Sequence, residues 1–109
     1  MSGPAWLLLA IVSEVIATTA LRASDGLSRP LPVVFVVAGY ALAFGALSRA
    51  LMTLPLGLSY AVWSALGTVG ALAAGWVIYG ERLGWTGALG VTLVVLGTAL
   101  LTGAGHGHG

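Results

Sequence analysis

The chain of 109 residues has no cysteine, no lysine and few charged residues of either sign. Without cysteine, the sequence excludes disulfide scaffolds, Cys-based zinc sites and thiol chemistry. Charged residues make up 6% of the chain, against about 25% in a typical soluble domain. They are too few to cover a water-facing surface, and a formal net charge of +1 builds no basic face for nucleic acid. The composition therefore excludes a soluble enzyme and a nucleic-acid binder.

What the sequence has instead is apolar residues, which form 59% of the chain and give a mean hydropathy of +1.05. They are arranged in four runs, each long enough to cross a hydrocarbon core of about 30 Å as a helix. We expect spans at about residues 4–21, 33–51, 56–79 and 85–102, separated by short polar connectors. Because these spans occupy nearly the whole chain, we predict an all-α membrane protein whose single four-helix transmembrane domain covers residues 1–109.

The arginines of the connectors give a weak orientation signal. The first and third connectors carry Arg22, Arg29 and Arg82, whereas the second carries Arg49. Positively charged loops favour the cytoplasmic side, so the first and third connectors are placed in the cytoplasm. The bias is small, and a chain this evenly balanced is able to insert in both orientations.

One carboxylate, that of Glu14, lies inside a predicted span. It is about ten residues into the first run, roughly 15 Å deep, and so near the bilayer centre. A charge there is disfavoured by at least ~2.5 kcal/mol, and no span interior offers a Lys or Arg to neutralise it. Burial opposes ionisation of a carboxyl group, so protons and cations are expected to compete for this one. Alternatively, a protonated Glu14 only hydrogen-bonds neighbouring helices.

Helical spacing places a stripe of residues beside Glu14. Positions three, four and seven residues away share its face, and they hold Leu7, Ala10, Ile11, Ala17, Thr18 and Leu21. The small side chains leave space around the carboxyl group, and the hydroxyl of Thr18 is able to hydrogen-bond it. The same small residues also permit close helix packing, so the stripe is compatible with both uses.

Aromatic residues at helical spacing occur on two other spans. Tyr60 and Trp63 are three residues apart on the third span, and Tyr40 and Phe44 are four apart on the second. Ring faces attract positive charge and tolerate many ligand shapes, so we interpret these residues as walls of an organic-cation site. Ordinary packing of the rings is the alternative.

The fourth span carries no charge and has small residues at packing distances, including Gly90 and Gly97. Such series are typical of close helix contact in membranes, and we expect this span to mediate dimerisation. Two histidines beyond it, His106 and His108, are expected to be solvated rather than to hold a metal.

Three segments resemble the small multidrug resistance family: AIVSEVIATTALRASDGLSRPLP (residues 10–32), LPLGLSYAVWSALGTVGA (54–71) and YGERL (79–83). The resemblance covers essentially the whole chain. Its most specific element is a glutamate midway in the first span followed, in the third, by Y-A-[VI]-W-[ST]. The family consists of four-helix, proton-coupled exporters of toxic organic cations. The resemblance therefore implies a homodimer of oppositely inserted, antiparallel subunits, in keeping with the weak charge bias.

The resemblance also implies roles for individual residues. Glu14 matches the glutamate that is shared between protons and substrate. The aromatic residues of the family's pocket fall on Tyr40, Tyr60 and Trp63. The substrate-facing stripe falls on Leu7, Ala10, Ala17 and Thr18, and the fourth-helix dimer contact on Gly90 and Gly97.

Two features favour the branch of the family that exports quaternary ammonium and polyaromatic cations. Guanidinium exporters carry Trp three residues after the glutamate, where this chain has Ala17. The pairs Thr18–Thr19 and Trp63–Ser64 also resemble the polyaromatic-cation branch. Ser64, like Phe44, is therefore expected to line the substrate pocket.

We predict a proton-coupled antiporter that exports hydrophobic and quaternary ammonium cations by alternating access, with protons and substrate competing for Glu14. The expected location is the cell inner (plasma) membrane, which the chain crosses several times. The expected partners are organic cations, protons, a second antiparallel copy and the bilayer. No enzyme activity, cofactor, metal or nucleic-acid partner is expected, because the sequence offers no nucleophile–base pair or metal-ligand cluster. The alternatives are a guanidinium exporter of the same family and a small, non-transporting scaffold subunit.

Overall fold

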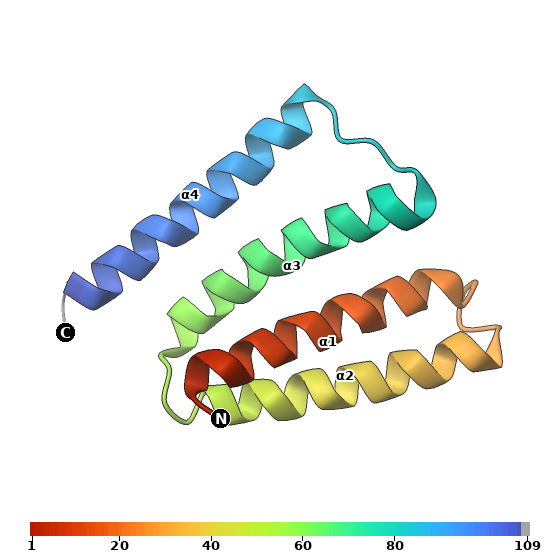
Figure 1. The fold of residues 1–109 in the computed structure, drawn as a ribbon, viewed down its shortest axis with the longest axis horizontal. Coiled ribbons are helices and arrows are strands. Elements are labelled where there is room, and N and C mark those ends of the chain that lie inside the picture. The colour runs from red at the N-terminus through yellow and green to blue at the C-terminus, as the bar shows by residue number, and fades with distance from the viewer. Residues whose placement is uncertain (108–109) are drawn as a thin grey trace. The chain divides into compact units, whose positions relative to one another are not determined.

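The computed structural model describes residues 1–107, which form four α-helices and no strand (Figure 1). Helix α1 spans Gly3–Ala23, α2 Pro30–Ala50, α3 Leu56–Tyr79 and α4 Trp85–Gly107. All four are long and apolar enough to cross a membrane. The prediction of an all-α membrane protein with four spanning helices is confirmed. His106 and His108 were expected to be solvated, but their side chains lie outside the part of the chain that the structure describes.

Prolines in the first turn set the starts of α1 and α2. In α1, Pro4 follows the N-cap Ser2, whose side chain accepts a hydrogen bond from the Ala5 N–H at 3.2 Å. Helix α2 begins at Pro30, earlier than the predicted residue 33. A proline nitrogen has no hydrogen to donate, and the first helical turn requires none, so Pro30 starts the helix instead of belonging to the connector. Helix α4 likewise continues to Gly107, beyond the predicted residue 102.

The helices group into two compact units, Met1–Thr53 with α1 and α2 and Leu54–Gly109 with α3 and α4. In the first unit, α1 and α2 run side by side in opposite directions (Figure 1). Small residues make their contact close, because a Cβ built on Gly39 of α2 would lie 2.7 Å from the Cβ of Ala17 in α1. That the two units form one four-helix domain stays a prediction.

The connector between α1 and α2 is a turn held by its own side chains. Ser24 is fully buried, and its Oγ donates to the Leu21 carbonyl at 2.6 Å and accepts from the Leu27 N–H at 3.0 Å. The guanidinium of Arg29 donates to the Ala23 carbonyl at the end of α1, at 3.3 Å. These bonds stabilise a tight turn, after which α2 runs antiparallel to α1. The middle of α2 therefore lies beside the middle of α1.

Candidate functional site

The carboxyl group of Glu14 lies in the middle of α1 and is half-buried. Thr18, one helical turn further along, donates its Oγ1 hydrogen to Glu14 Oε1 at 2.9 Å. A spacing of four residues puts two side chains on the same helical face, so this contact forms within α1 alone. The carboxyl group thus has a hydroxyl partner from its own helix.

Tyr40 adds a second hydroxyl, from α2. Its oxygen lies 2.7 Å from Oγ1 of Thr18. A hydroxyl group has one hydrogen, and Thr18 gives its own to Glu14, so the hydrogen of Tyr40 points to Thr18 in this arrangement. Two hydrogen bonds therefore link Glu14, Thr18 and Tyr40 across the two helices. All three are residues that the sequence predicted for the site, and the structure brings them together.

Gly39 makes that crossing contact possible. A Cβ at this position would lie 2.7 Å from the Ala17 Cβ and 3.2 Å from the Ser13 carbonyl oxygen. Only a residue without a side chain lets α2 approach α1 this closely, and Tyr40 is the next residue along α2. Gly39 is not among the residues predicted from the sequence. The available signal was a glycine adjacent to a candidate tyrosine inside a span, where small residues permit close packing.

Phe44 extends the aromatic surface of α2. Its ring stacks with that of Tyr40, with ring centroids 6.4 Å apart and planes inclined by 27°. This is the contact expected from a spacing of four residues on a helix. The side chain of Phe44 is 59% exposed, so much of the ring is open to a ligand or to lipid.

Most residues beside Glu14 on α1 are almost fully buried, whereas residues that line an open pocket are partly exposed. Leu7 is 6% exposed, and Ala10 and Ala17 are 0% exposed. Ala17 lies directly against Gly39 of α2, which gives it a packing role. Thr18 is half-buried and is committed to the hydrogen bonds described above. That this stripe faces substrate stays a prediction.

The remaining candidate aromatics belong to the second unit. On α3, Tyr60 is 69% exposed, whereas Trp63 and Ser64 are half-buried. Ser59, the neighbour of Tyr60, is 1% exposed, and within the described residues its Oγ has no hydrogen-bond partner. The assembly of these residues with Glu14 into one site stays a prediction.

Gly90 and Gly97 lie on an open face of α4. Both are exposed, and a Cβ added at either would meet nothing within 4 Å in the described chain. Thr98 of α4 donates a hydrogen bond to the Ala61 carbonyl of α3 at 3.3 Å. Among residues 85–103 no side chain is buried, so most of this helix is uncovered.

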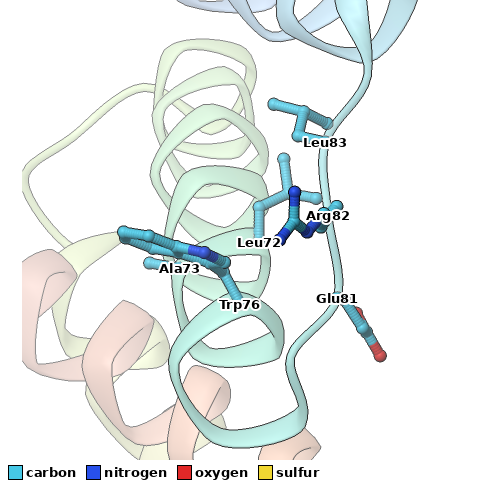
Figure 2. A pocket seen from close by; sticks show the side chains of 6 residues that line it. All are labelled: Leu72, Ala73, Trp76, Glu81, Arg82 and Leu83. Carbon is cyan, nitrogen blue, oxygen red and sulfur yellow. The ribbon is translucent and has the colours of Figure 1, made fainter.

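A pocket of about 620 Å³ lies at the C-terminal end of α3 (Figure 2). Its lining comes from the last turns of the helix and from the loop that follows: Leu72, Ala73, Trp76, Glu81, Arg82 and Leu83. None of these residues is among those predicted for the cation site. The pocket is therefore a separate feature of the second unit.

Comparisons with known proteins give a consistent result. The family model described as Small Multidrug Resistance protein matches residues 4–94. The quaternary ammonium compound-resistance protein QacF of Klebsiella aerogenes is 48% identical over 98 residues, which cover 88% of this chain and 89% of the relative. QacE of Escherichia coli, with the same description, is 44% identical over 101 residues, covering 93% and 92%. The spermidine export protein MdtI of Citrobacter koseri is 40% identical over 97 residues, covering 89% of each.

Proposed function

The chain belongs to the small multidrug resistance family, and on that premise we propose that it is a proton-coupled antiporter exporting hydrophobic and quaternary ammonium cations. Members of this family are efflux transporters rather than enzymes. Its four candidate spans and its family make the chain a multi-pass protein of the inner membrane. The observation that carries the proposal is the mid-span carboxyl group of Glu14, which is bonded to Thr18 and linked through it to Tyr40.

A proton and an organic cation compete for Glu14. An ionised carboxylate at the membrane centre is disfavoured by at least ~2.5 kcal/mol. A bound proton removes this charge and a bound cation compensates it, so either occupant stabilises the group and each excludes the other. Alternating access converts the competition into exchange. A proton from outside releases the cation, and loss of the proton on the cytoplasmic side lets the next cation bind.

The hydroxyl chain responds to which occupant is present. With the carboxylate ionised, Thr18 donates to Glu14 and Tyr40 donates to Thr18. A protonated carboxyl group is itself a donor, so Thr18 then accepts from Glu14 and donates its own hydrogen to Tyr40. The hydrogen of Tyr40 is free to turn toward another acceptor. Protonation of a group on α1 thereby changes the bonding of a residue on α2.

Aromatic rings supply the remaining attraction for a large cation. A ring face contributes about 0.5–2 kcal/mol to cation binding, depending on how far the site is dried. Tyr40 and Phe44 present stacked rings on α2, and the half-buried Trp63 and the exposed Tyr60 present rings on α3. Because ring faces do not require one ligand shape, they suit a set of substrates that vary in structure.

The transporter works as an antiparallel homodimer in this proposal. Support comes from α4, where Gly90 and Gly97 leave space for a neighbouring helix to approach closely. Two Glu14 carboxyl groups, one from each subunit, then face one chamber.

Export of polyamines is a second candidate. Spermidine export proteins of Citrobacter koseri and Klebsiella pneumoniae are 40% and 42% identical to this chain. A polyamine carries its charge on N–H donors, which a carboxylate binds directly. It gains less from ring faces than an aromatic cation does, so the two substrate classes are separable by their dependence on Trp63.

Proton release on addition of a cation tests the proposal. The purified protein in detergent should release protons when an aromatic quaternary ammonium compound is added, and the Glu14→Gln variant should release none. Asp25→Asn, which neutralises an exposed carboxylate in the α1–α2 connector, is the matched control and should behave as the unchanged protein. Absence of proton release from the unchanged protein would refute the proposal and favour a scaffold subunit. Stronger release with spermidine or guanidinium would favour those substrates instead.

A further inference from the structure

The pocket at the end of α3 is closed on one side by the loop that leaves this helix. Gly80 adopts a left-handed conformation with φ 68°, and its N–H donates to the Trp76 carbonyl at 3.1 Å. The N–H of Glu81 donates to the Gly75 carbonyl, also at 3.1 Å. A left-handed glycine turns the chain back at a helix C-terminus. The loop residues therefore lie beside the last turns of α3 and enclose the pocket with them (Figure 2).

Arg82 brings a positive charge into this pocket. Figure 2 shows its guanidinium turned toward Leu72 and α3. Among the residues that the structure describes, this guanidinium has no hydrogen-bond or ion-pair partner. Arg29, by contrast, donates to the Ala23 carbonyl at 3.3 Å. A guanidinium group presents five N–H donors and stays charged, so that of Arg82 is available to an anionic ligand.

The neighbouring carboxylate does not share this place. Glu81 contributes to the lining, but its carboxylate points away from Arg82, on the other side of the loop (Figure 2). There it lies against Gly75, where an added Cβ would collide with it and which is not part of the lining. Glu81 also has an interaction partner of its own. The charge that the lining directs into the pocket is therefore positive.

The rest of the lining is apolar and lies at the end of a membrane span. It consists of four residues: Leu72, Ala73, Trp76 and Leu83. The side chain of Trp76 is 67% exposed, and that of Trp85, at the start of α4, is 92% exposed. Tryptophans at the ends of spanning helices lie at the level of lipid headgroups. A lipid at this depth has its headgroup near Arg82 and its hydrocarbon near Trp76.

From this arrangement we propose that the pocket binds the headgroup of an anionic phospholipid. Arg82 binds the phosphate, because a guanidinium fork matches phosphate oxygens. The upper parts of the acyl chains lie along Trp76. A volume of about 620 Å³ falls within the roughly 300–1,000 Å³ of ordinary small-molecule pockets. The site goes beyond the proposed transport and does not depend on it.

Charge selects an anionic headgroup over a zwitterionic one. A zwitterionic headgroup carries an ammonium group a few bonds from its phosphate, so binding at Arg82 brings two positive charges close together. At this end of α3 the ammonium group finds few acceptors, because the carbonyls of Gly75 and Trp76 already accept hydrogen bonds from the loop. The Glu81 carboxylate points away from the pocket. An anionic headgroup such as that of phosphatidylglycerol carries hydroxyls instead of an ammonium group and avoids this repulsion.

Competitive lipid binding measured by native mass spectrometry tests this proposal. The detergent-solubilised protein is mixed with equal amounts of phosphatidylglycerol, phosphatidylethanolamine and phosphatidylcholine that carry the same acyl chains. Phosphatidylglycerol should be retained in preference to both others. Arg82→Gln should reduce its retention about tenfold or more, the loss expected when a hydrogen bond to a charged group is removed. Arg82→Lys should reduce it less, because lysine keeps the charge but not the planar fork.

Arg49→Gln is the matched control for charge, because it removes an arginine from the end of α2 rather than from the pocket. It should leave the retention of phosphatidylglycerol unchanged. A loss equal to that in Arg82→Gln would indicate a bulk charge effect and would overturn the proposal. Equal retention of the three lipids, or a preference for either zwitterionic lipid, would also overturn it.

A second pair of variants tests the pocket itself. Ala73→Leu fills part of the lining and leaves Arg82 in place, so the retention of phosphatidylglycerol should fall about fivefold or more. Ala71→Leu adds the same side chain at an exposed position of α3 outside the lining and should leave the retention unchanged. Full retention in Ala73→Leu would place the lipid outside this pocket. Displacement of the lipid by inorganic phosphate would make the pocket a site for free anions, and either result would overturn the proposal.

Discussion

The two helix pairs differ in how far their spans are covered. In α1, 28% of the most apolar stretch is buried, and in α4 none of it is. The first pair holds a carboxyl group in mid-span that accepts a hydrogen bond from Thr18 of α1, and Thr18 is bonded in turn to Tyr40 of α2. The second pair exposes rings on α3 and open glycines on α4. The difference supports the proposal that the polar chemistry belongs to the first pair and that a second copy packs on the faces that the second pair leaves open.

Removal of the charge from the first pair should have the largest effect. Glu14→Gln keeps the size of the side chain but can neither release a proton nor compensate a cation, so cation uptake driven by a pH gradient in proteoliposomes should fall to background. Glu14→Asp retains the carboxyl group and should retain transport. Asp25→Asn should transport as the unchanged protein does, because its carboxylate lies outside the spans. If Glu14→Gln takes up cation as fast as the unchanged protein does, the carboxyl group of the first pair is not needed for transport, and this pair has no special role in it.

Closing the open face of α4 should have the next largest effect. Gly90→Leu or Gly97→Leu places a large side chain where the single chain has free space, so each variant should fold. Each should dimerise at least about fivefold more weakly than the unchanged protein, since overpacking a contact costs about 1–3 kcal/mol. Light scattering in detergent measures the oligomeric state, and circular dichroism checks the helix content.

Gly45→Leu provides the matched test on the first pair, because Gly45 of α2 also has nothing within 4 Å of an added Cβ. It should leave the dimer intact. If Gly45→Leu abolishes the dimer and the α4 variants do not, the dimer interface lies on the first pair and not on α4.

A single methyl group at Gly39 should damage the first pair. Its Cβ would collide with Ala17, so Gly39→Ala should lower the free energy of unfolding by about 1–3 kcal/mol and weaken cation binding. Thermal unfolding in detergent and equilibrium cation binding measure the two effects. Gly45→Ala is the control on the same helix and should be neutral. Gly39→Ala combined with Ala17→Gly should recover part of both properties, because the added Cβ still lies 3.2 Å from the Ala17 Cα and from the Ser13 carbonyl oxygen. No recovery at all would argue against the contact with the Ala17 Cβ.

Contacts within one helix were the ones that the sequence predicted well. The Glu14–Thr18 and Tyr40–Phe44 contacts follow from a spacing of four residues, because helical periodicity alone places such pairs together. The four spans were equally predictable, because continuous apolar runs of this length have few other uses. The start of α2 at Pro30 was missed, because a connector rich in proline and a proline-led helix start look alike in sequence.

Contacts between elements were not predictable from the residues. The meeting of Thr18 and Tyr40 depends on the register of α1 against α2, which the close approach at Gly39 sets and which no spacing within one helix encodes. The pocket at the end of α3 depends on the left-handed turn at Gly80 and on the direction that it gives to Arg82. Both features arise from backbone geometry at a glycine.

Two tryptophans of α3 provide a smaller test within the second pair. Trp63→Ala should weaken binding of an aromatic cation by about twofold to thirtyfold, because a cation–π contact contributes about 0.5–2 kcal/mol. Trp76→Ala removes a ring of the same kind from the separate pocket and should change this affinity little. Equilibrium binding of a fluorescent aromatic cation measures both. Equal losses would mean that Trp63 only packs, and the second pair would then contribute no ring to the cation site.

The smallest expected effect tests whether the hydroxyls of the first pair act as a chain. Tyr40→Phe keeps the ring but removes one hydrogen bond, worth about 0.5–1.5 kcal/mol, so cation affinity should fall about twofold to tenfold. Thr18→Val removes the link between Tyr40 and Glu14, so adding Tyr40→Phe to it should cause almost no further loss. Linked groups give such non-additive effects, whereas independent groups give effects that add. If the losses of cation affinity in Thr18→Val and Tyr40→Phe, measured by equilibrium binding at one pH, add fully in the double variant, Tyr40 acts on the cation separately. Protonation of Glu14 would then not affect α2 through the hydrogen bonds of Thr18.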